Sequence, residues 1–430
     1  MSCNWPQVKL GELVEITSSK RVKMADYVEK GVPFFRSKEV IERYKGNTIT
    51  TELYITEEHY QAIKDKFGAP EEGHILLTSV GTLGIPYQVQ ANDKFYFKDG
   101  NLTWFKEFGN AIDAEYLFYW LTSPIAKRKF DEITIGSTQK ALTIVALKGI
   151  EIDLPPKNVQ KQVVQIVKSL DKKLANNRGV NQTLEQMAQA IFKSWFVDFD
   201  PVKAKMNGEQ PEGMDAATAS LFPEKLVESE LGLIPEGWDV GTLSDVAKYC
   251  SARTKTDSIT LENYISTENM LAEKKGVTAA SKLPTAKTVA AYKSGDILVS
   301  NIRPYFKKIW LAEGSGGRSN DVLGFESVSA NTESYLMNVL YQDTFFEYMT
   351  RTSKGAKMPR GDKTAIMNWE MAVPPVELRE AFSAIVDKFY QLIPQNRAQN
   401  ATLESLRDTL LPKLLSGELS LTDSLEVTNV

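Results

Sequence analysis

Apolar residues recur at steps of three and four from Pro155-Pro156 to Trp195, with one irregular step between Leu170 and Leu174. Spacing of this kind places the residues on one face of a helix, and a face that persists over many turns is typical of a coiled coil. Two Asn residues interrupt the face, and a buried Asn weakens a coiled coil but fixes its register. The pattern predicts one long helix with a seam made of Val163, Ile166, Leu170, Leu174, Asn177, Asn181, Leu184 and Ile191.

The same pattern recurs without a gap after a second proline pair, Pro374-Pro375. Pro394 falls inside this second helix and should kink it. Two helices with matching seams and matching seam Asn residues are natural partners, although each could instead pack as a core helix on its own domain. The second seam is expected at Phe382, Ile385, Phe389, Asn396, Asn400 and Leu403.

The segments outside the helices also repeat in outline. Short strand-like runs punctuated by Gly, Pro, Asn and Asp fill the first segment, with a helical pattern from Ala114 to Phe130. In the second segment, Ser294 to Ser300 resembles Glu72 to Thr78. A repeat of this length indicates a tandem duplication. We expect an α+β fold in which two globular, mixed α/β domains are separated by two long helices forming a coiled coil, as a tandem repeat.

The repeat sets the expected domain boundaries. Pro and Gly residues between the first helix and the second domain favour an extended linker. The expected parts are a first domain at 1–153, a first helix at 154–200, a linker at 201–236, a second domain at 237–372, a second helix at 373–417 and a tail at 418–430.

The net charge of −4 argues mildly against a nucleic-acid-binding protein, but the charge is segregated. Eight acidic residues and one Lys lie between Glu209 and Asp239, whereas five basic residues and one Asp lie between Arg351 and Lys363. Local fields steer a polyanion more than the total charge does. The two Cys residues form no metal or disulfide pattern, and no apolar run is long enough to cross a bilayer, so we expect a cytoplasmic protein.

The sequence offers little material for catalysis. The chain has only two His residues, His59 and His74, and no phosphate-binding motif. Gly314-Ser315-Gly316-Gly317 lacks the Lys and the following helix of such a motif, so a plain loop is the better interpretation. We therefore expect a binding protein with no catalytic and no metal-binding residues.

Polar and basic segments with nearby aromatic residues are the candidate binding surfaces. Arg and Lys can pair with guanine edges, Asn and Gln with adenine edges, and Ser and Thr suit phosphate. For any single residue a solvated surface charge is an equal alternative, so the clusters carry more weight than their members. The predicted DNA-binding residues are Ser19, Lys20, Arg21, Lys23, Arg36, Ser37, Lys38, Thr78, Ser79, Thr82, Thr138, Gln139 and Lys140 in the first domain, and Arg253, Thr254, Lys255, Asn301, Arg303, Tyr305, Lys307, Lys308, Arg318, Lys354, Lys357, Arg360 and Lys363 in the second.

Several motifs resemble those of one known family, the specificity subunits of type I restriction–modification systems. The resemblance covers both repeats and rests on the proline-headed helices and on four segments, which are Ile191 to Lys203, Gly232 to Trp238, Gly295 to Pro304 and Leu411 to Glu418.

This resemblance implies two target-recognition domains that each read one half of a split target in double-stranded DNA. The two long helices would lie antiparallel, as a pseudo-twofold repeat, and would dock two methyltransferase (M) subunits, which bind S-adenosylmethionine and methylate adenine. Motor-nuclease restriction (R) subunits, which use ATP and magnesium, would join for cleavage. This chain would bind no cofactor and no membrane, and would catalyse nothing.

Two other function classes remain. A structural adaptor of another defence complex would bind DNA only incidentally. A fused nuclease is less favoured, because the chain has no spare domain to hold one.

Overall fold

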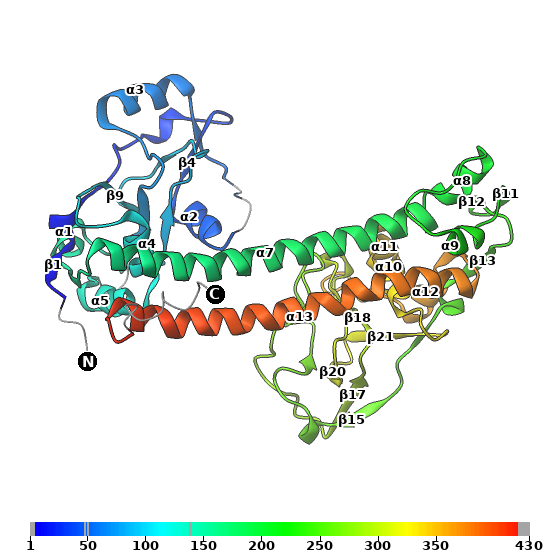
Figure 1. Ribbon diagram of the computed structural model, residues 1–430. Helices are drawn as coiled ribbons and strands as arrows, with labels where there is room; N and C mark the ends of the chain where they lie inside the picture. The colour runs from blue at the N-terminus through cyan, green and yellow to red at the C-terminus, as the bar shows by residue number, and fades with distance from the viewer. Residues whose placement is uncertain (1–4, 47–48, 50, 137–139, 420–430) are drawn as a thin grey trace, which may run out of the picture. The chain divides into compact units, whose positions relative to one another are not determined.

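The computed structural model describes residues 5–46, 49, 51–136 and 140–419, which pack into two compact units (Figure 1). Unit 1 contains the chain up to residue 176 and from residue 399 onward, and unit 2 contains residues 177–398. The two long helices are α7 (Lys157–Phe196) and α13 (Val376–Leu415), and each contributes one part to each unit.

A four-stranded antiparallel sheet forms the centre of unit 1. Its strand order is β2 (Val14–Thr17), β9 (Leu102–Phe108), β6 (Ile75–Thr78) and β7 (Pro86–Gln88). Successive side chains of a strand point to opposite faces, so the apolar run of β6 serves two cores. Ile75 and Leu77 pack in the core that includes helices α4 (Ala114–Thr122) and α5 (Pro124–Ile133), whereas Leu76 packs on the other face.

A second sheet covers that other face, in the order β3 (Tyr27–Val28), β5 (Tyr54–Ile55), β4 (Val32–Phe35) and β8 (Tyr96–Phe97). Strands β4 and β8 are parallel, and the other pairs are antiparallel. The remaining elements of unit 1 are β1 (Gln7–Lys9), which pairs with β10 (Glu151–Asp153), the helices α1 (Leu10–Leu13), α2 (Ser37–Tyr44), α3 (Glu57–Phe67) and α6 (Ile144–Gly149), and the 3₁₀ turn η1 (Met24–Asp26).

Unit 2 repeats the first sheet of unit 1. Its strands follow the corresponding antiparallel order, which is β14 (Ala247–Tyr249), β21 (Val322–Ser327), β18 (Ile297–Ser300) and β19 (Ile309–Leu311). Helices α10 (Glu333–Tyr341) and α11 (Asp343–Arg351) follow, as α4 and α5 do in unit 1. The tandem duplication predicted from the sequence therefore extends to strand order and to the helices that follow.

The second sheets of the two units differ. In unit 2 the order is β15 (Arg253–Lys255), β17 (Thr288–Tyr292), β20 (Gly316–Arg318) and β16 (Tyr264–Ile265). The parallel pair β16–β20 corresponds to β4–β8, but β17 pairs with β20, whereas its counterpart in position, β5, pairs with β4. Other elements of unit 2 are β13 (Asp239–Thr242) paired with β22 (Glu370–Val373), α12 (Lys363–Met367), and the 3₁₀ turns η2 (Leu243–Asp245), η3 (Thr256–Ser258) and η4 (Pro304–Phe306).

Within unit 2, α7 and α13 run antiparallel, as predicted. Asn181 Oδ1 accepts a hydrogen bond of 2.8 Å from Asn396 Nδ2, and Asn181 Nδ2 donates to the Ile393 carbonyl at 3.4 Å. Further along α7, Phe192 meets Phe382 on the earlier part of α13, with ring centroids 5.7 Å apart. The helix continues through Pro394 to Leu415.

Every predicted seam residue is buried or half-buried, but the prediction left out the buried positions Val167, Val386 and Ile393, and it misplaced the irregular step. Val167 is fully buried, whereas Ile166 is only partly so. With Val167 in the seam, the steps through Val163, Leu170 and Leu174 alternate four, three and four. The irregular step disappears because Ile166 belongs to the flank of the seam, where it packs against the core of unit 1.

The linker expected to be extended is folded. It contains α8 (Asp200–Met206), α9 (Ala216–Ser220) and a hairpin of β11 (Leu226–Ser229) and β12 (Gly232–Pro235). Its apolar side chains explain why, because Val202, Phe222 and Ile234 are buried in the core of unit 2. Trp195 at the end of α7 meets the Phe222 ring edge-on at 5.1 Å.

Candidate nucleic-acid interface

The predicted segments of unit 1 meet at one end of its sheets, where β2, β4, β6 and β8 end and β9 begins. The loop before β9 connects them, because Asn101 offers its carbonyl to Ser79 N at 2.9 Å and to Ser37 Oγ at 3.4 Å. Ser19 Oγ donates to the carbonyl of Phe97, the last residue of β8, at 2.8 Å. Three segments that are distant in the sequence thus form one surface, which we call the loop end of unit 1.

A fourth segment joins the loop end from the other side of β6. Gly81 N donates to the Lys140 carbonyl at 3.4 Å, and Leu142 N donates to the Ser79 carbonyl at 2.9 Å. The loop that carries Thr82 is therefore fixed against Lys140. The predicted residues Thr138 and Gln139 lie outside the described residues.

The loop end of unit 1 is rich in exposed cations. Lys98 belongs to this set but was missed by the sequence analysis; its N–H donates to the carbonyl of Phe35 at 2.9 Å. The signal was its position directly after β8, which parallels Arg36 after β4. The exposed cations of this end are Lys20, Arg21, Lys23, Lys38, Lys98 and Lys140.

Arg36 is held in place by Glu39, whose side chain is fully buried. Arg36 Nη2 donates to one carboxylate oxygen of Glu39 at 3.0 Å, and Arg36 N donates to the other at 2.8 Å. The side-chain hydrogen bond to Glu39 raises the pKa of Arg36 above its ordinary value, so the guanidinium stays charged. It is fixed at the first turn of α2, with about a third of its side chain exposed.

Two predicted hydroxyl residues of unit 1 are buried instead of exposed. Thr78 Oγ1 accepts from Ile85 N at 2.9 Å, and Ser79 Oγ lies 2.6 Å from Thr103 Oγ1. Their hydroxyls therefore shape the loop after β6, and we do not carry them into the proposed DNA surface.

Unit 2 has the same loop end. Asn301 N donates to the Asp321 carbonyl at 2.8 Å, as Ser79 N does to Asn101. Gly361 N donates to the Asn301 carbonyl at 3.1 Å, as Leu142 N does to Ser79. The loop after β18 and the basic segment 354–363 thus occupy the places that the loop after β6 and the segment before Leu142 occupy in unit 1.

The side chains on this shared framework differ. In unit 2 the backbone of Arg360 forms an isolated β-bridge with Ile302. At the matching place in unit 1, Ala141 forms the β-bridge with Val80. An Asp321 oxygen lies 3.2 Å from Arg360 Nη2, while 57 % of the Arg360 side chain remains exposed. The carboxylate therefore orients a guanidinium that still faces solvent.

Three predicted cations of unit 2 are buried or partly buried and use their charged groups within the protein. Arg318 is buried and donates to the carbonyls of Ala291, Val322 and Cys250, and its burial lowers its pKa. Lys308 Nζ donates to the Thr267 carbonyl at 2.6 Å.

Lys307 forms an ion pair with Asp343 at 2.9 Å. Asn301 is also buried, at 6 % exposure. A charge pattern cannot separate these residues from free surface cations, so they stay outside the proposed surface.

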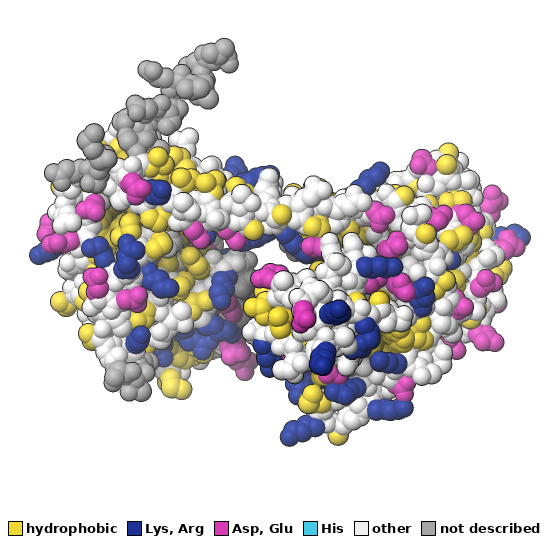
Figure 2. Space-filling view, turned by 90° about the horizontal axis from the view of Figure 1, so that it is seen from below, with side chains coloured by type: hydrophobic (Ala, Val, Ile, Leu, Met, Phe, Trp, Pro, Cys, Tyr) yellow, Lys and Arg dark blue, Asp and Glu magenta, His cyan; other side chains and the backbone are white. Residues whose placement is uncertain are grey.

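The remaining predicted residues of unit 2 lie at the surface, except that Arg303 is only partly exposed and its Nε is buried. Thr254 is half-buried, with its Oγ1 2.9 Å from Ser258 Oγ, and Lys354 pairs with Asp362. Arg253 donates to the Thr288 carbonyl at 2.9 Å. Figure 2 shows many Lys and Arg side chains on the part of unit 2 that faces the viewer. The exposed members are Arg253, Lys255, Tyr305, Lys354, Lys357, Arg360 and Lys363.

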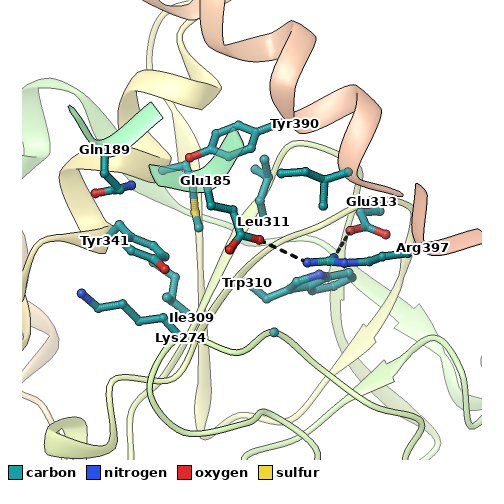
Figure 3. A pocket seen from close by; sticks show the side chains of 13 residues that line it. Glu185, Gln189, Lys274, Ile309, Trp310, Leu311, Glu313, Tyr341, Tyr390 and Arg397 are labelled. Carbon is teal, nitrogen blue, oxygen red and sulfur yellow. Dashed lines mark hydrogen bonds and ion pairs between the residues drawn. The ribbon is translucent and has the colours of Figure 1, made fainter. Parts of the chain in front are cut away.

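A narrow pocket of unit 2, with a volume of about 70 Å³, lies where α7 and α13 meet β19 (Figure 3). Arg397 bridges two carboxylates there, with Nη1 2.7 Å from Glu313 and Nη2 3.5 Å from Glu185. Burial raises the pKa of Glu185, and Arg397 counteracts this shift. The ion pairs tie both helices to the sheet, so the pocket serves structure.

The described part of the chain contains no cluster of three or more His, Cys, Asp or Glu residues that could hold a metal ion. Nor does any helix there have the length and apolar character needed to cross a bilayer. The geometry defines a protein with two similar units, each with a basic loop end suited to a polyanion.

Comparisons with known proteins agree with the resemblance found in the sequence. Residues 3–186 match the model of the type I restriction modification DNA specificity domain. The MjaIX type I specificity subunit of Methanocaldococcus jannaschii is 26% identical, over 97% of this chain and 94% of its own. The HindI specificity subunit of Haemophilus influenzae is 24% identical, over 72% and 78% of the two chains.

The fold agrees with a solved relative. The crystal structure of the S subunit of a type I restriction–modification system from M. genitalium matches 96% of both chains with a TM-score of 0.53 and 14% identity. The resemblance found in the sequence is confirmed, because the chain is similar to type I restriction–modification specificity subunits.

Proposed function

We propose that this chain is the sequence-specific DNA-recognition subunit of a type I restriction–modification complex. Unit 1 reads one half of a split target in double-stranded DNA, and unit 2 reads the other. The observation that carries the proposal is the shared loop end, built by matching backbone hydrogen bonds in both units but fitted with different side chains. A common framework suits the common shape of a duplex, and different side chains suit different bases.

The exposed cations supply the part of binding that does not depend on sequence. Lys and Arg that neutralise phosphates release counterions, so affinity falls steeply with salt concentration. The acidic linker offsets these cations in the net charge of −4. Specificity then rests on the few side chains that can reach base edges, such as Arg360.

The same chain acts as a scaffold. The two long helices are similar and antiparallel, so they present two similar surfaces that suit two copies of one partner. We assign these copies as the methyltransferase subunits. They bind S-adenosylmethionine and methylate adenine, and restriction subunits with ATP and magnesium join for cleavage. The chain itself is non-catalytic, binds no cofactor and works in the cytoplasm.

A selection experiment tests the proposal. The complex of this chain with its methyltransferase subunits is incubated with a library of random duplexes, and the bound fraction is sequenced. We expect two short conserved blocks separated by a spacer of fixed length and free sequence. Equal retention of all duplexes would instead favour a structural adaptor.

A further inference from the structure

One turn in the loop end of unit 2 presents two aromatic rings to solvent. Tyr305 and Phe306 are 46 % and 37 % exposed, and their ring centroids lie 4.8 Å apart. Rings of this size normally supply burial energy to a core or an interface. An exposed pair in a surface that binds a ligand therefore requires an explanation.

The backbone holds the rings out rigidly. Arg303 and Lys307, on either side of the turn η4, both have a φ of 50°, a left-handed conformation that is strained for residues other than Gly. Three backbone hydrogen bonds stabilise it, from Arg303 N to the Pro359 carbonyl at 2.8 Å, and from Glu273 N and Lys274 N to the carbonyls of Phe306 and Lys307 at 2.9 Å. Strain maintained by several supports is typical of functional positions.

The surroundings of the rings suit a nucleic acid. The turn joins the end of β18 to β19, and Arg303, the residue before it, donates a hydrogen bond to Pro359 in the basic segment 354–363. A shallow hollow beside Tyr305, about 330 Å³ in volume, is lined by Arg351, by Glu347 and by Lys307, which pairs with Asp343. Exposed aromatic rings beside the basic segment 354–363 favour a polyanion with flat bases over an apolar protein surface.

We propose that the turn of Tyr305 and Phe306 is a wedge that enters the duplex and unstacks one base step in the half-site of unit 2. Inserted apolar side chains open base steps and kink the duplex, which lets a protein contact more of it. This inference rests on the proposed function. It applies to one half-site only, because the matching loop of unit 1, from Ser79 to Ile85, contains no aromatic residue.

The test uses duplexes that carry the selected target with 2-aminopurine at one adenine position at a time. The fluorescence of 2-aminopurine rises when it loses its stacking partners. The adenines that become methylated are left unsubstituted, because methyltransferases extrude their target base. The protein is the complex of the full chain with its methyltransferase subunits.

For the wild-type complex we expect a fluorescence rise at one step in the half-site of unit 2. The double variant Tyr305→Ala/Phe306→Ala should abolish the rise and weaken target binding roughly tenfold, as expected for lost base stacking. Tyr305→Phe should keep the rise, because it keeps the ring. Val328→Ala is the matched control, since Val328 is an exposed apolar residue that follows the other end of β21.

Absence of any such step in the wild-type complex, or persistence of the rise in the double variant, would overturn the wedge. In either case, unchanged preference for the target over a shuffled duplex would leave the proposed function intact. A wild-type complex with no preference for the target would instead reject the proposed function itself.

Discussion

At the scale of single residues, Arg360 is the best candidate for a base contact in unit 2. Its guanidinium is exposed, yet Asp321 fixes its orientation at 3.2 Å. A fixed guanidinium can present two donors to one guanine, which is the commonest specific contact in DNA recognition. Asp321 is then a positioning residue, which acts through Arg360.

Arg360→Ala should weaken binding to the cognate target by about 1–3 kcal/mol and relax one base position in the half-site of unit 2. Asp321→Asn should relax the same position to a smaller degree, because the guanidinium remains but loses its support. The measurement is binding to duplexes with every single-base change in the target. Asp257→Asn, an exposed residue in the 3₁₀ turn η3, is the control.

Equal loss on the target and on random duplexes would make Arg360 a phosphate contact. A change in the half-site of unit 1 would contradict the assignment of the units to separate half-sites.

Only part of the candidate surface could be predicted from residue types. Arg318 and Arg360 look alike in the sequence, but one donates to three carbonyls inside the unit and the other faces solvent. Burial depends on which strands become neighbours, and the second sheets of the two units are ordered differently. The clusters could be found from charge, whereas the free members within each cluster required the fold.

At the scale of elements, the two long helices α7 and α13 are the part of the fold that the sequence predicts best. Periodicity was enough to predict them and their pairing, because an apolar seam that persists over many turns is specific to long paired helices. Their antiparallel direction was predicted from the family resemblance. Periodicity could not decide whether Ile166 or Val167 belongs to the seam, because two adjacent apolar residues both fit an approximate period. Periodicity did not predict the folded linker either, because its few buried apolar residues follow no regular spacing, although they pack into the core of unit 2.

The buried Asn pair supplies a test of register. Asn396→Leu alone leaves the buried Asn181 Oδ1 without its donor, so we expect a loss of about 1–3 kcal/mol in the free energy of unfolding. Asn181→Leu/Asn396→Leu should recover most of this loss but allow the helices to shift. Chemical denaturation measures the first effect, and the length of the recognised spacer reports the second.

Gln182→Leu, an exposed change on the same helix, is the control for this cycle. A double variant that keeps one unchanged spacer length would show that the Asn pair does not set the register.

The corrected seam has its own test. Val167→Ala should reduce the free energy of unfolding by about 1–3 kcal/mol, because it removes two methyl groups from a fully buried position. The same substitution at Val145, which is 82 % exposed in unit 1, should change it by less than about 0.5 kcal/mol. Thermal or chemical unfolding distinguishes the two, and equal losses would place Val167 outside the seam.

The length of the helices should determine the spacing of the two half-sites. Removal of one heptad from both α7 and α13, around residues 176 and 399, shortens the pair by roughly 10 Å, or about three base pairs. We expect a target with the same two half-sites and a shorter spacer. Removal from one helix only is the control and should abolish assembly, because the seams no longer match.

An unchanged spacer in the shortened variant would exclude the helices as the element that sets half-site spacing.

At the scale of the whole molecule, duplication accounts for the division of labour. The parts that repeat most closely are the helices and the first sheet, which form the framework, and the parts that differ are the second sheets and the loop-end side chains. A repeated framework presents two similar surfaces, and these suit two copies of the same partner. Divergent loop ends allow two half-sites of unrelated sequence.

The measurement that tests the central claim most directly is a base-resolution map of adenine methylation in the DNA of the host, with and without the gene for this chain. We predict a motif of two short blocks separated by a fixed spacer, present in the intact strain and absent after deletion. Restoring the gene with Arg360→Ala should relax only one block. Methylation that is unchanged by deletion, while the methyltransferase subunit is present and active, would contradict the account.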